Sequence, residues 1–328
     1  MDTNNQKMFS LNGCDRARIV HVFSRIFQCQ NITLLTHKNP DFDGMGACAA
    51  FAHILQTLGK NVEVIYPNEP GTPIPYLTPK ALFNEHKQIP EIIVALDVAN
   101  MERLYFPPAF ANIEFVNIDH HVSNSIHATH NFVDGACSSA AEMLFVMLWI
   151  YDKALITRQV AEAILCGIFY DTLVLRTSST TEQTLRVVEY LKATGLVWTD
   201  VVKSVIKPLA SRDFLLWGEL MSRIQISDSG KVAWIGVRES ELVERNFEKR
   251  SLDGFVNNMA QMIDIDITFF AFEMADVTTK ISLRSKKADV NAIAQQLGGG
   301  GHVRAAGLLI RSELDEAMRE LVDVIEAS

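Results

Sequence analysis

The fold of this chain is decided by residues 32–46, ITLLTHKNPDFDGMG, where an apolar run gives way to a polar turn. The first five residues, 32–36, are the short β-rich run that predicts a buried strand. Residues 44–58, closed by Gly59, have the composition of a helix. Pro40 disfavours helix at the residue before it, so the turn between strand and helix stays open. The stretch therefore predicts a strand, a turn and a helix, which together begin a βαβ unit.

The same alternation continues along the chain and predicts an α/β protein with a mainly parallel sheet flanked by helices. Further strands are expected at 62–66, 91–96 and 113–118, and helices at 138–152, 157–169, 180–194 and 199–206. Pro208 interrupts the helical pattern and marks a boundary, so we expect one domain over residues 1–207 and a second over 212–328. The second is predicted to be a smaller α/β domain with a mixed sheet, built from helices at 212–224, 253–263, 290–297 and 313–326 and strands at 232–237, 267–273, 277–283 and 306–310.

Composition limits the class of function. The 328 residues include 48% hydrophobic and 21% charged residues and carry a formal net charge of −9, which is the composition of a folded globular protein. Both predicted domains have an excess of acids. A binder of long duplex nucleic acid neutralises many phosphates with Lys and Arg, so that class is disfavoured, whereas a short anionic substrate is compatible with this charge.

The sequence predicts no membrane association and a cytoplasmic location. The longest apolar run, residues 143–151, is too short to span a bilayer, and no basic segment followed by an apolar one opens the chain. Five cysteines without a C-x-x-C pair indicate free thiols in a reducing compartment.

Acidic and histidine side chains follow three of the predicted strands. Since the carboxyl ends of parallel strands meet at one edge of a sheet, we expect these groups to lie together there. Imidazole and carboxylate donors suit divalent ions such as Mn²⁺. The first turn also suits an Asx-rich turn in which Asp43 caps the helix, and this alternative stays open. The candidate residues are His37, Asp41, Asp43, Asp97, Asp119, His120 and His121, together with Asp171, which ends a helical stretch.

These motifs carry a family resemblance. His37…Asp41-Phe-Asp43, Ala95-Leu-Asp97, Asp119-His120-His121 and Gly167-Ile-Phe-Tyr-Asp171-Thr resemble, in this order, four motifs of the DHH phosphoesterase superfamily. Gly298-Gly-Gly-Gly-His302, with Ser282-Leu-Arg284 upstream, resembles the DHHA1 domain that accompanies it. The two-domain length is similar to that of the nano-RNase/pAp-phosphatase branch.

The resemblance implies a centre of two divalent metal ions, with Mn²⁺ as the first choice and Mg²⁺ or Co²⁺ as alternatives. His37 and Asp41 would hold one ion, and Asp43, His120 and Asp171 the other, with Asp97 bridging them. Asp119 would orient a ligand histidine, and His121 would ligate or contact the phosphate. Asp97, Asp119, His120 and His121 form the implied catalytic set.

The second domain would hold the substrate. The resemblance implies a role for Arg284, Gly299, Gly300, Gly301 and His302, and four successive glycines let backbone N–H groups approach an anion.

The implied activity is hydrolysis of short oligoribonucleotides by a metal-activated water, of the exonuclease type, together with release of the 3′-phosphate of 3′-phosphoadenosine 5′-phosphate (pAp). Two alternatives stay open: a phosphodiesterase acting on cyclic dinucleotides or their linear product pApA, and a catalytically silent nucleotide sensor. The expected partners are short oligonucleotides or small nucleotides, and a homodimer is compatible with the sequence.

Overall fold

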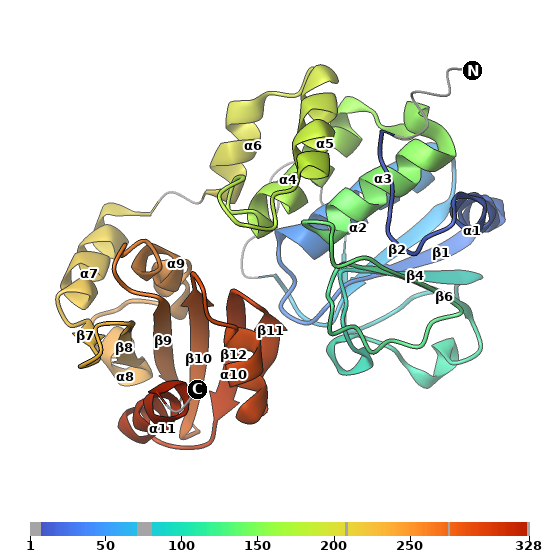
Figure 1. Ribbon diagram of the computed structural model, residues 1–328. Helices are drawn as coiled ribbons and strands as arrows, with labels where there is room; N and C mark the ends of the chain where they lie inside the picture. Colours follow the sequence, from blue (N-terminus) through green and yellow to red (C-terminus); the bar gives the residue numbers. More distant parts are fainter. Residues whose placement is uncertain (1–7, 71–80, 207–208, 275, 327–328) are drawn as a thin grey trace. The chain divides into compact units, whose positions relative to one another are not determined.

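The computed structural model describes residues 8–70, 81–206, 209–274 and 276–326. The chain divides into two compact units, residues 1–207 and 208–328. Figure 1 shows that each unit is a β-sheet with helices packed against it.

The first unit is built on a sheet whose six strands are all parallel. The order is β3-β2-β1-β4-β5-β6, with bounds β1 Asn31–Leu35, β2 Asn61–Tyr66, β3 Leu82–Phe83, β4 Ile92–Leu96, β5 Glu114–Asp119 and β6 His130–Val133. The chain moves outward from β1 in one direction to β2 and β3, and then returns to place β4 on the other side of β1. In such doubly wound sheets ligands bind at the carboxyl ends of the strands where the direction reverses, which here is between β1 and β4. The predicted parallel sheet is confirmed. Both β3 and β6 were missed because they are short.

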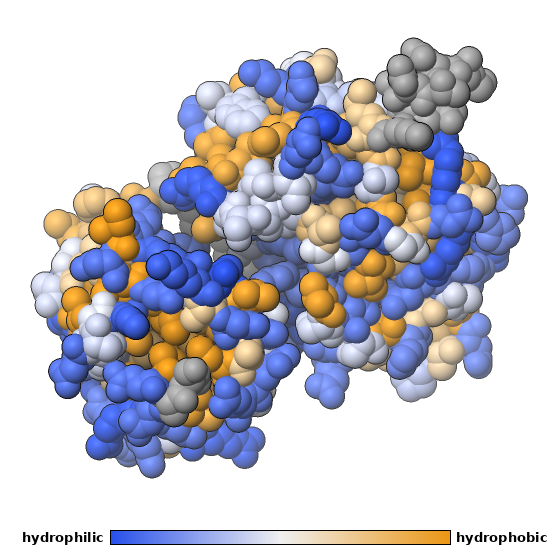
Figure 2. Space-filling view, in the orientation of Figure 1, coloured by the Kyte–Doolittle hydropathy of each residue, from blue (hydrophilic) through white to orange (hydrophobic). Residues whose placement is uncertain are grey.

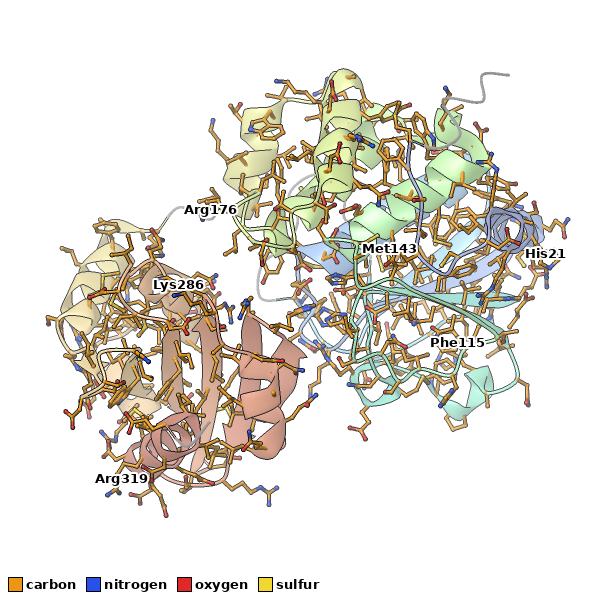
Figure 3. All side chains as sticks on the ribbon, in the orientation of Figure 1. His21, Phe115, Met143, Arg176, Lys286 and Arg319 are labelled. Atoms are coloured by element: carbon orange, nitrogen blue, oxygen red, sulfur yellow. The ribbon has the colours of Figure 1, made fainter. Side chains whose placement is uncertain are left out.

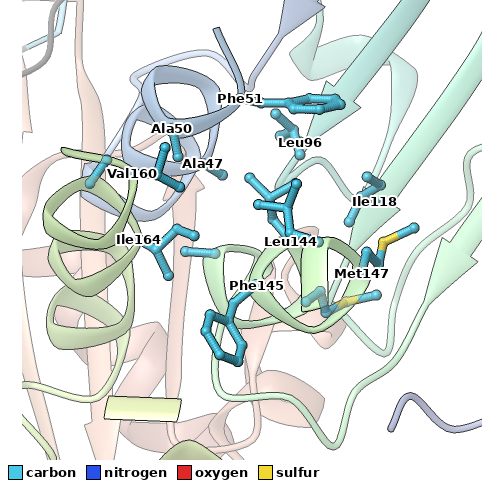
Figure 4. Packing of buried hydrophobic residues seen from close by; sticks show 14 of the residues in the cluster. Ala47, Ala50, Phe51, Leu96, Ile118, Leu144, Phe145, Met147, Val160 and Ile164 are labelled. Atoms are coloured by element: carbon cyan, nitrogen blue, oxygen red, sulfur yellow. The ribbon is translucent and has the colours of Figure 1, made fainter. Parts of the chain in front are cut away.

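Six α-helices pack around this sheet in the described part of the unit. They are α1 Arg16–Gln28, α2 Phe42–Thr57, α3 Ala140–Asp152, α4 Arg158–Asp171, α5 Glu182–Ala193 and α6 Trp198–Val205, with short 3₁₀ turns at Met101–Arg103 (η2), Pro108–Phe110 (η3) and Lys153–Leu155 (η4). The four predicted helices beyond residue 137 are confirmed, and α1 was not predicted. Almost every residue of α3 is buried, including Met143, so it forms the centre of the core (Figures 3 and 4).

Helices α2 and α4 approach each other closely because glycine lies at their contact. A Cβ atom on Gly46 of α2 would lie 2.6 Å from the carbonyl oxygen of Ala163 on α4. A Cβ atom on Gly167 of α4 would lie 2.6 Å from Cβ of Ala141 and 2.7 Å from Oδ1 of Asp43. Neither position has room for a larger residue without movement of its neighbours, so this packing fixes the depth at which Asp43 lies.

The second unit has a mixed sheet in the order β11-β12-β10-β9-β8-β7, in which β8 and β9 are parallel and the other pairs antiparallel. The predicted mixed sheet is confirmed. Its strands are β7 Gln225–Ile226, β8 Val232–Arg238, β9 Ile267–Met274, β10 Thr278–Ser285, β11 Gly300–His302 and β12 Ala305–Ile310; its helices are α7 Ser211–Met221, α8 Glu239–Glu244, α9 Phe255–Met259, α10 Val290–Gln296 and α11 Leu314–Glu326, with a 3₁₀ turn at Lys249–Leu252 (η5).

One predicted helix of this unit is wrong in length. Residues 253–263 were expected to be helical, but α9 covers only Phe255–Met259. Gly254 takes a left-handed conformation (φ +85°), which delays the start, and Ile263 is 94% exposed, so no apolar face stabilises the far end.

The described residues contain no helix that is both long and apolar enough to cross a membrane. Polar side chains cover much of the visible face of each unit, with apolar ones interspersed (Figure 2). All five cysteines are free, as the sequence predicts.

Candidate metal centre

The turn after β1 is fixed by Asp41, which caps α2. Its Oδ1 accepts hydrogen bonds from the backbone N–H groups of Asp43 (3.0 Å) and Gly44 (3.3 Å). The alternative in which Asp43 caps the helix is therefore wrong: Asp43 lies within the first turn of α2 and points into the interior. Because capping uses only Oδ1, Oδ2 of Asp41 is left to face His37, at 3.6 Å from Nε2.

A first cluster consists of His37, Asp41 and Asp97. His37 follows β1 and is 3% exposed, and Asp97 follows β4 and is 2% exposed. Nε2 of His37 lies 3.3 Å from Oδ2 of Asp97. One ligand atom from each of the three residues lies within 4.8 Å of the others, so together they offer three oxygen or nitrogen ligands to one cation.

A second cluster consists of Asp43, His120 and Asp171. Nε2 of His120, just after β5, lies 3.1 Å from Oδ2 of Asp171 and 3.8 Å from Oδ2 of Asp43. Asp171 is the last residue of α4. Asp43 is fully buried, and its two oxygens accept hydrogen bonds from the backbone N–H groups of Ala140 (2.7 Å) and Ala141 (2.9 Å) in the first turn of α3. The dipole of α3 therefore stabilises this carboxylate.

Asp97 lies between the two clusters. Its Oδ2 faces His37, whereas its Oδ1 faces Nε2 of His120 at 3.6 Å. Oδ1 is buried and accepts no hydrogen bond from the described residues. The backbone of Asp97 is left-handed (φ +62°), an uncommon conformation that concentrates at functional sites.

His121 is held by Asp119. Its Nδ1 lies 2.7 Å from Oδ1 of Asp119, and Nδ2 of Asn124 donates to Oδ2 of the same carboxylate at 2.6 Å. The sequence suggested that Asp119 orients a ligand histidine, and the ring that it contacts is that of His121. Asn124, which the sequence does not single out, therefore helps to hold the Asp119 carboxylate against His121.

The charges of the two clusters shift the pKa values of their members. Burial alone would lower the pKa of His37, but its contacts with Asp41 and Asp97 outweigh burial and raise that pKa to about 10. Burial would likewise raise the pKa of Asp97, but the neighbouring histidines hold it below its usual range. Burial and the carboxylates of Asp97 and Asp171 raise the pKa of Asp43. In the absence of a cation, protons therefore compensate the charge of the carboxylates.

The residues present fit divalent metal ions. Imidazole nitrogens and carboxylate oxygens are the donors that Mn²⁺, Zn²⁺ and similar ions accept, and no cysteine thiolate belongs to either cluster. A buried carboxylate oxygen without a hydrogen bond, such as Oδ1 of Asp97, is costly unless a cation or proton compensates it.

The predicted substrate residues of the second unit lie around β10 and β11. Arg284 is on β10, where its Nε donates to Oδ1 of Asn257 (2.8 Å) and its Nη1 to the carbonyl of Leu283 (2.8 Å). The nearby Lys286, labelled in Figure 3, donates to the carbonyls of Met262 and Ile265.

The glycine run differs from the open anion-binding loop that the sequence suggested. The N–H groups of Gly298 and Gly299 donate to α10, and that of Gly301 donates to Oδ1 of Asn291 at 2.9 Å. Gly300 and Gly301 belong to the edge strand β11 with His302. At least three of the four N–H groups are therefore already used within the unit, and an anion site here would depend mainly on side chains.

Comparison with known proteins agrees with this geometry. Residues 31–168 match the family described as the DHH family, N-terminal domain, and residues 231–328 match the DHHA1 domain. The chain carries a DHH domain and a DHHA1 domain. These two matches confirm the resemblance of the motifs, and with it the class of enzyme: a phosphoesterase, which is a hydrolase.

Several curated relatives match over most of this chain. The bifunctional oligoribonuclease and PAP phosphatase NrnA of Thermus thermophilus is 26% identical over 300 residues, covering 90% of this chain and 89% of that protein. NrnA of Bacillus subtilis is 23% identical and covers 89% of this chain and 93% of that protein. The cyclic-di-AMP phosphodiesterase GdpP of Bacillus subtilis is 25% identical and covers 95% of this chain but only 50% of that protein.

A solved structure shows the same fold. The exopolyphosphatase-related protein of Bacteroides fragilis superposes with a TM-score of 0.86 at 22% identity, covering 97% of this chain and 98% of that one. RecJ of Thermus thermophilus, solved with Mn²⁺, gives a TM-score of 0.58 at 14% identity and covers 98% of this chain and 55% of that one.

Proposed function

We propose that this phosphoesterase uses two divalent metal ions, of which Mn²⁺ is the first choice. With them it hydrolyses short oligoribonucleotides to mononucleotides and removes the 3′-phosphate of pAp. The observation that carries the proposal is the position of Asp97, whose two carboxylate oxygens face separate clusters. That arrangement is suited to a carboxylate that bridges two ions. The similarity to NrnA proteins over nearly the whole chain supports the choice of substrates.

His37, Asp41 and Asp97 would hold one ion, and Asp43, His120, Asp171 and the second oxygen of Asp97 the other. When bound, such ions supply a water of lowered pKa as nucleophile and neutralise charge on the phosphoryl oxygens.

The protein's own side chains orient the ligands and exclude water. Asp119 accepts a hydrogen bond from Nδ1 of His121 and so fixes the tautomer and orientation of that ring. Packing of α2, α3 and α4 around Asp43 excludes water from the far side of the second cluster. Four ligating carboxylates against two divalent ions leave the centre near neutral, so a phosphodiester can enter without strong repulsion.

The second unit is proposed to bind the rest of a small nucleotide through Arg284 and His302. A net charge of −9 and a small number of cationic contacts favour a substrate of one to a few nucleotides over a polymer.

Mononucleotide release from pApA in the presence of Mn²⁺ tests the proposal. We expect wild-type protein to produce AMP, and Asp97→Asn to lose about a hundred- to a thousandfold in rate, the range for removal of one charge-stabilising group at a reacting centre. Asp134→Asn is the matched control, because Asp134 is also buried (5% exposed), but within the described residues its carboxylate accepts hydrogen bonds only from residues 12, 136 and 137. Full activity of Asp97→Asn would refute the two-ion centre.

A second candidate is a phosphodiesterase of cyclic dinucleotides. The match of 95% of this chain to the cyclic-di-AMP phosphodiesterase GdpP favours it. Parallel assays with pApA, pAp and cyclic di-AMP separate the two, because opening of the cyclic compound at a rate comparable to pApA cleavage would identify the phosphodiesterase. Tight nucleotide binding without turnover of any of the three would identify a sensor.

A further inference from the structure

A guanidinium group lies against the first cluster and takes no part in the functions assigned above. Arg103 belongs to η2, which follows Asp97, and its Nη2 lies 2.7 Å from Nδ1 of His37. The backbone ties the two segments together, since the N–H of Lys38 donates to the carbonyl of Arg103 at 2.7 Å. Within the described residues, no carboxylate forms an ion pair with Arg103.

Nδ1 of His37 has a second neighbour, the carbonyl oxygen of Lys38, at 2.9 Å. A guanidinium group can only donate hydrogen bonds and a carbonyl oxygen can only accept them. Nδ1 must therefore be an unprotonated acceptor to bond with Arg103 and a protonated donor to bond with Lys38. The two contacts exclude each other, and the position of one proton on the ring decides between them.

A ring protonated on both nitrogens and a ring bound to an ion through Nε2 both favour the contact with Lys38, because Nδ1 carries a proton in each. Nε2 of His37 faces both carboxylates of the first cluster, so it is the nitrogen placed to ligate an ion. A neutral imidazole that gives its Nε2 lone pair to an ion carries its proton on Nδ1, and ligand histidines commonly donate that proton to a backbone carbonyl. In that state Nη2 of Arg103 faces another donor, and its remaining contact, with the carbonyl of Lys38, is 3.5 Å long.

We propose that Arg103 binds the phosphoryl oxygens of the substrate and of the phosphate product. The proposal rests on the function proposed above and adds a residue to the same site. Arg is suited to the task because its planar donors match two phosphate oxygens at once. Arg103 also places a positive charge beside a centre whose other charged side chains are mostly acids. Without it, an anion would be attracted there by the metal ions alone.

Binding of inorganic phosphate to the Mn²⁺-loaded full chain, followed by calorimetry, tests the contact without any need for turnover. We expect Arg103→Gln to weaken phosphate binding by about 10–100-fold, the range for loss of a hydrogen bond between charged groups. Arg103→Lys should recover part of the loss, because it keeps the charge but not the paired donors. Lys38→Gln removes the same charge from an exposed neighbouring side chain and should change the affinity by less than about threefold, since exposed charges interact weakly.

Affinity for Mn²⁺ itself separates this role from a structural one. If Arg103 binds phosphate, Arg103→Gln should bind Mn²⁺ as tightly as wild type or more tightly, because a cation next to the site has been removed. If Arg103 instead supports His37, Mn²⁺ binding should weaken, and that result would overturn the proposal.

Two other outcomes also overturn it: phosphate affinity unchanged in Arg103→Gln, or lowered equally by Lys38→Gln. If Arg103→Gln does not fold, Arg103→Lys is compared with wild type through KM and kcat for pApA. Loss of a phosphate contact lowers kcat/KM and leaves Mn²⁺ affinity unchanged, whereas loss of support for His37 lowers Mn²⁺ affinity. Failure of wild-type protein to cleave pApA would refute the proposed function but would leave the phosphate measurement intact.

Discussion

A methyl group added at Gly167 tests whether the packing of α4 sets the position of Asp43. The new Cβ in Gly167→Ala would lie 2.6 Å from Cβ of Ala141 and 2.7 Å from Oδ1 of Asp43, closer than real Cβ atoms approach other atoms. Overpacking of this kind costs about 1–3 kcal/mol. The gain from replacing glycine in a helix is about 0.5–1 kcal/mol, so we expect a net loss of stability.

Gly218→Ala is the matched control. Gly218 also lies in a helix, α7, but a Cβ atom there meets nothing within 4 Å, so only the helix-propensity gain remains. Guanidinium titration should therefore show Gly167→Ala destabilised by about 0.5–2 kcal/mol and Gly218→Ala stabilised by about 0.5–1 kcal/mol.

The affinity of the same two variants for Mn²⁺ tests the effect of this packing on the metal centre. The added methyl group in Gly167→Ala pushes against the carboxylate of Asp43, so Mn²⁺ binding at the second cluster should weaken by at least about tenfold, which corresponds to 1.4 kcal/mol. Gly218→Ala should bind Mn²⁺ like wild type. If Gly167→Ala is as stable as Gly218→Ala and binds Mn²⁺ normally, the packing argument is refuted.

Three further predictions concern the ligands, protons and backbone of the centre. Asp97→Asn should lower the affinity for both Mn²⁺ ions, because each cluster loses a charged ligand; loss of only one ion in a calorimetric titration would contradict the bridging role. Protons compete with the ion for His37, whose pKa is raised to about 10, so the affinity for Mn²⁺ should rise with pH, by up to about tenfold per unit between about pH 6 and 8 for each proton displaced; an affinity independent of pH would contradict this. Leu173 is left-handed (φ +47°), which costs a residue other than glycine about 1–2 kcal/mol, so Leu173→Gly should raise the thermal unfolding midpoint or leave it unchanged despite the greater freedom of the unfolded chain, and a clear fall would contradict the strain.

Much of the site followed from the sequence because a parallel sheet brings its strand ends together. Once residues 32–36, 91–96 and 113–118 were interpreted as parallel strands, the acids behind them had to meet at one edge, and the structure places Asp43 and Asp97 there with His120.

The features that could not be predicted depend on side-chain direction and on tertiary contacts. The helix cap at Asp41 rather than Asp43 follows from which carboxylate faces the N–H groups of α2. No motif in the sequence indicates the left-handed backbone of Asp97 or the contact between Arg103 and His37. The N–H groups of Gly298 and Gly299 donate hydrogen bonds to carbonyls at the end of α10, which a run of glycines does not by itself predict.

The second unit shows the same limit at the level of elements. Its predicted strands and most helices were confirmed, but of the helix predicted over 253–263 only Phe255–Met259 forms, because Gly254 is left-handed and Ile263 is exposed.

Anomalous diffraction from crystals grown with Mn²⁺ measures directly whether Asp97 bridges two metal ions. We expect two anomalous peaks about 3.5–4 Å apart, the separation usual in two-metal hydrolytic sites, with one oxygen of Asp97 on each. His37 and Asp41 should contact one peak, and His120 and Asp171 the other. A single peak, or two peaks of which Asp97 contacts only one, would contradict the bridging role.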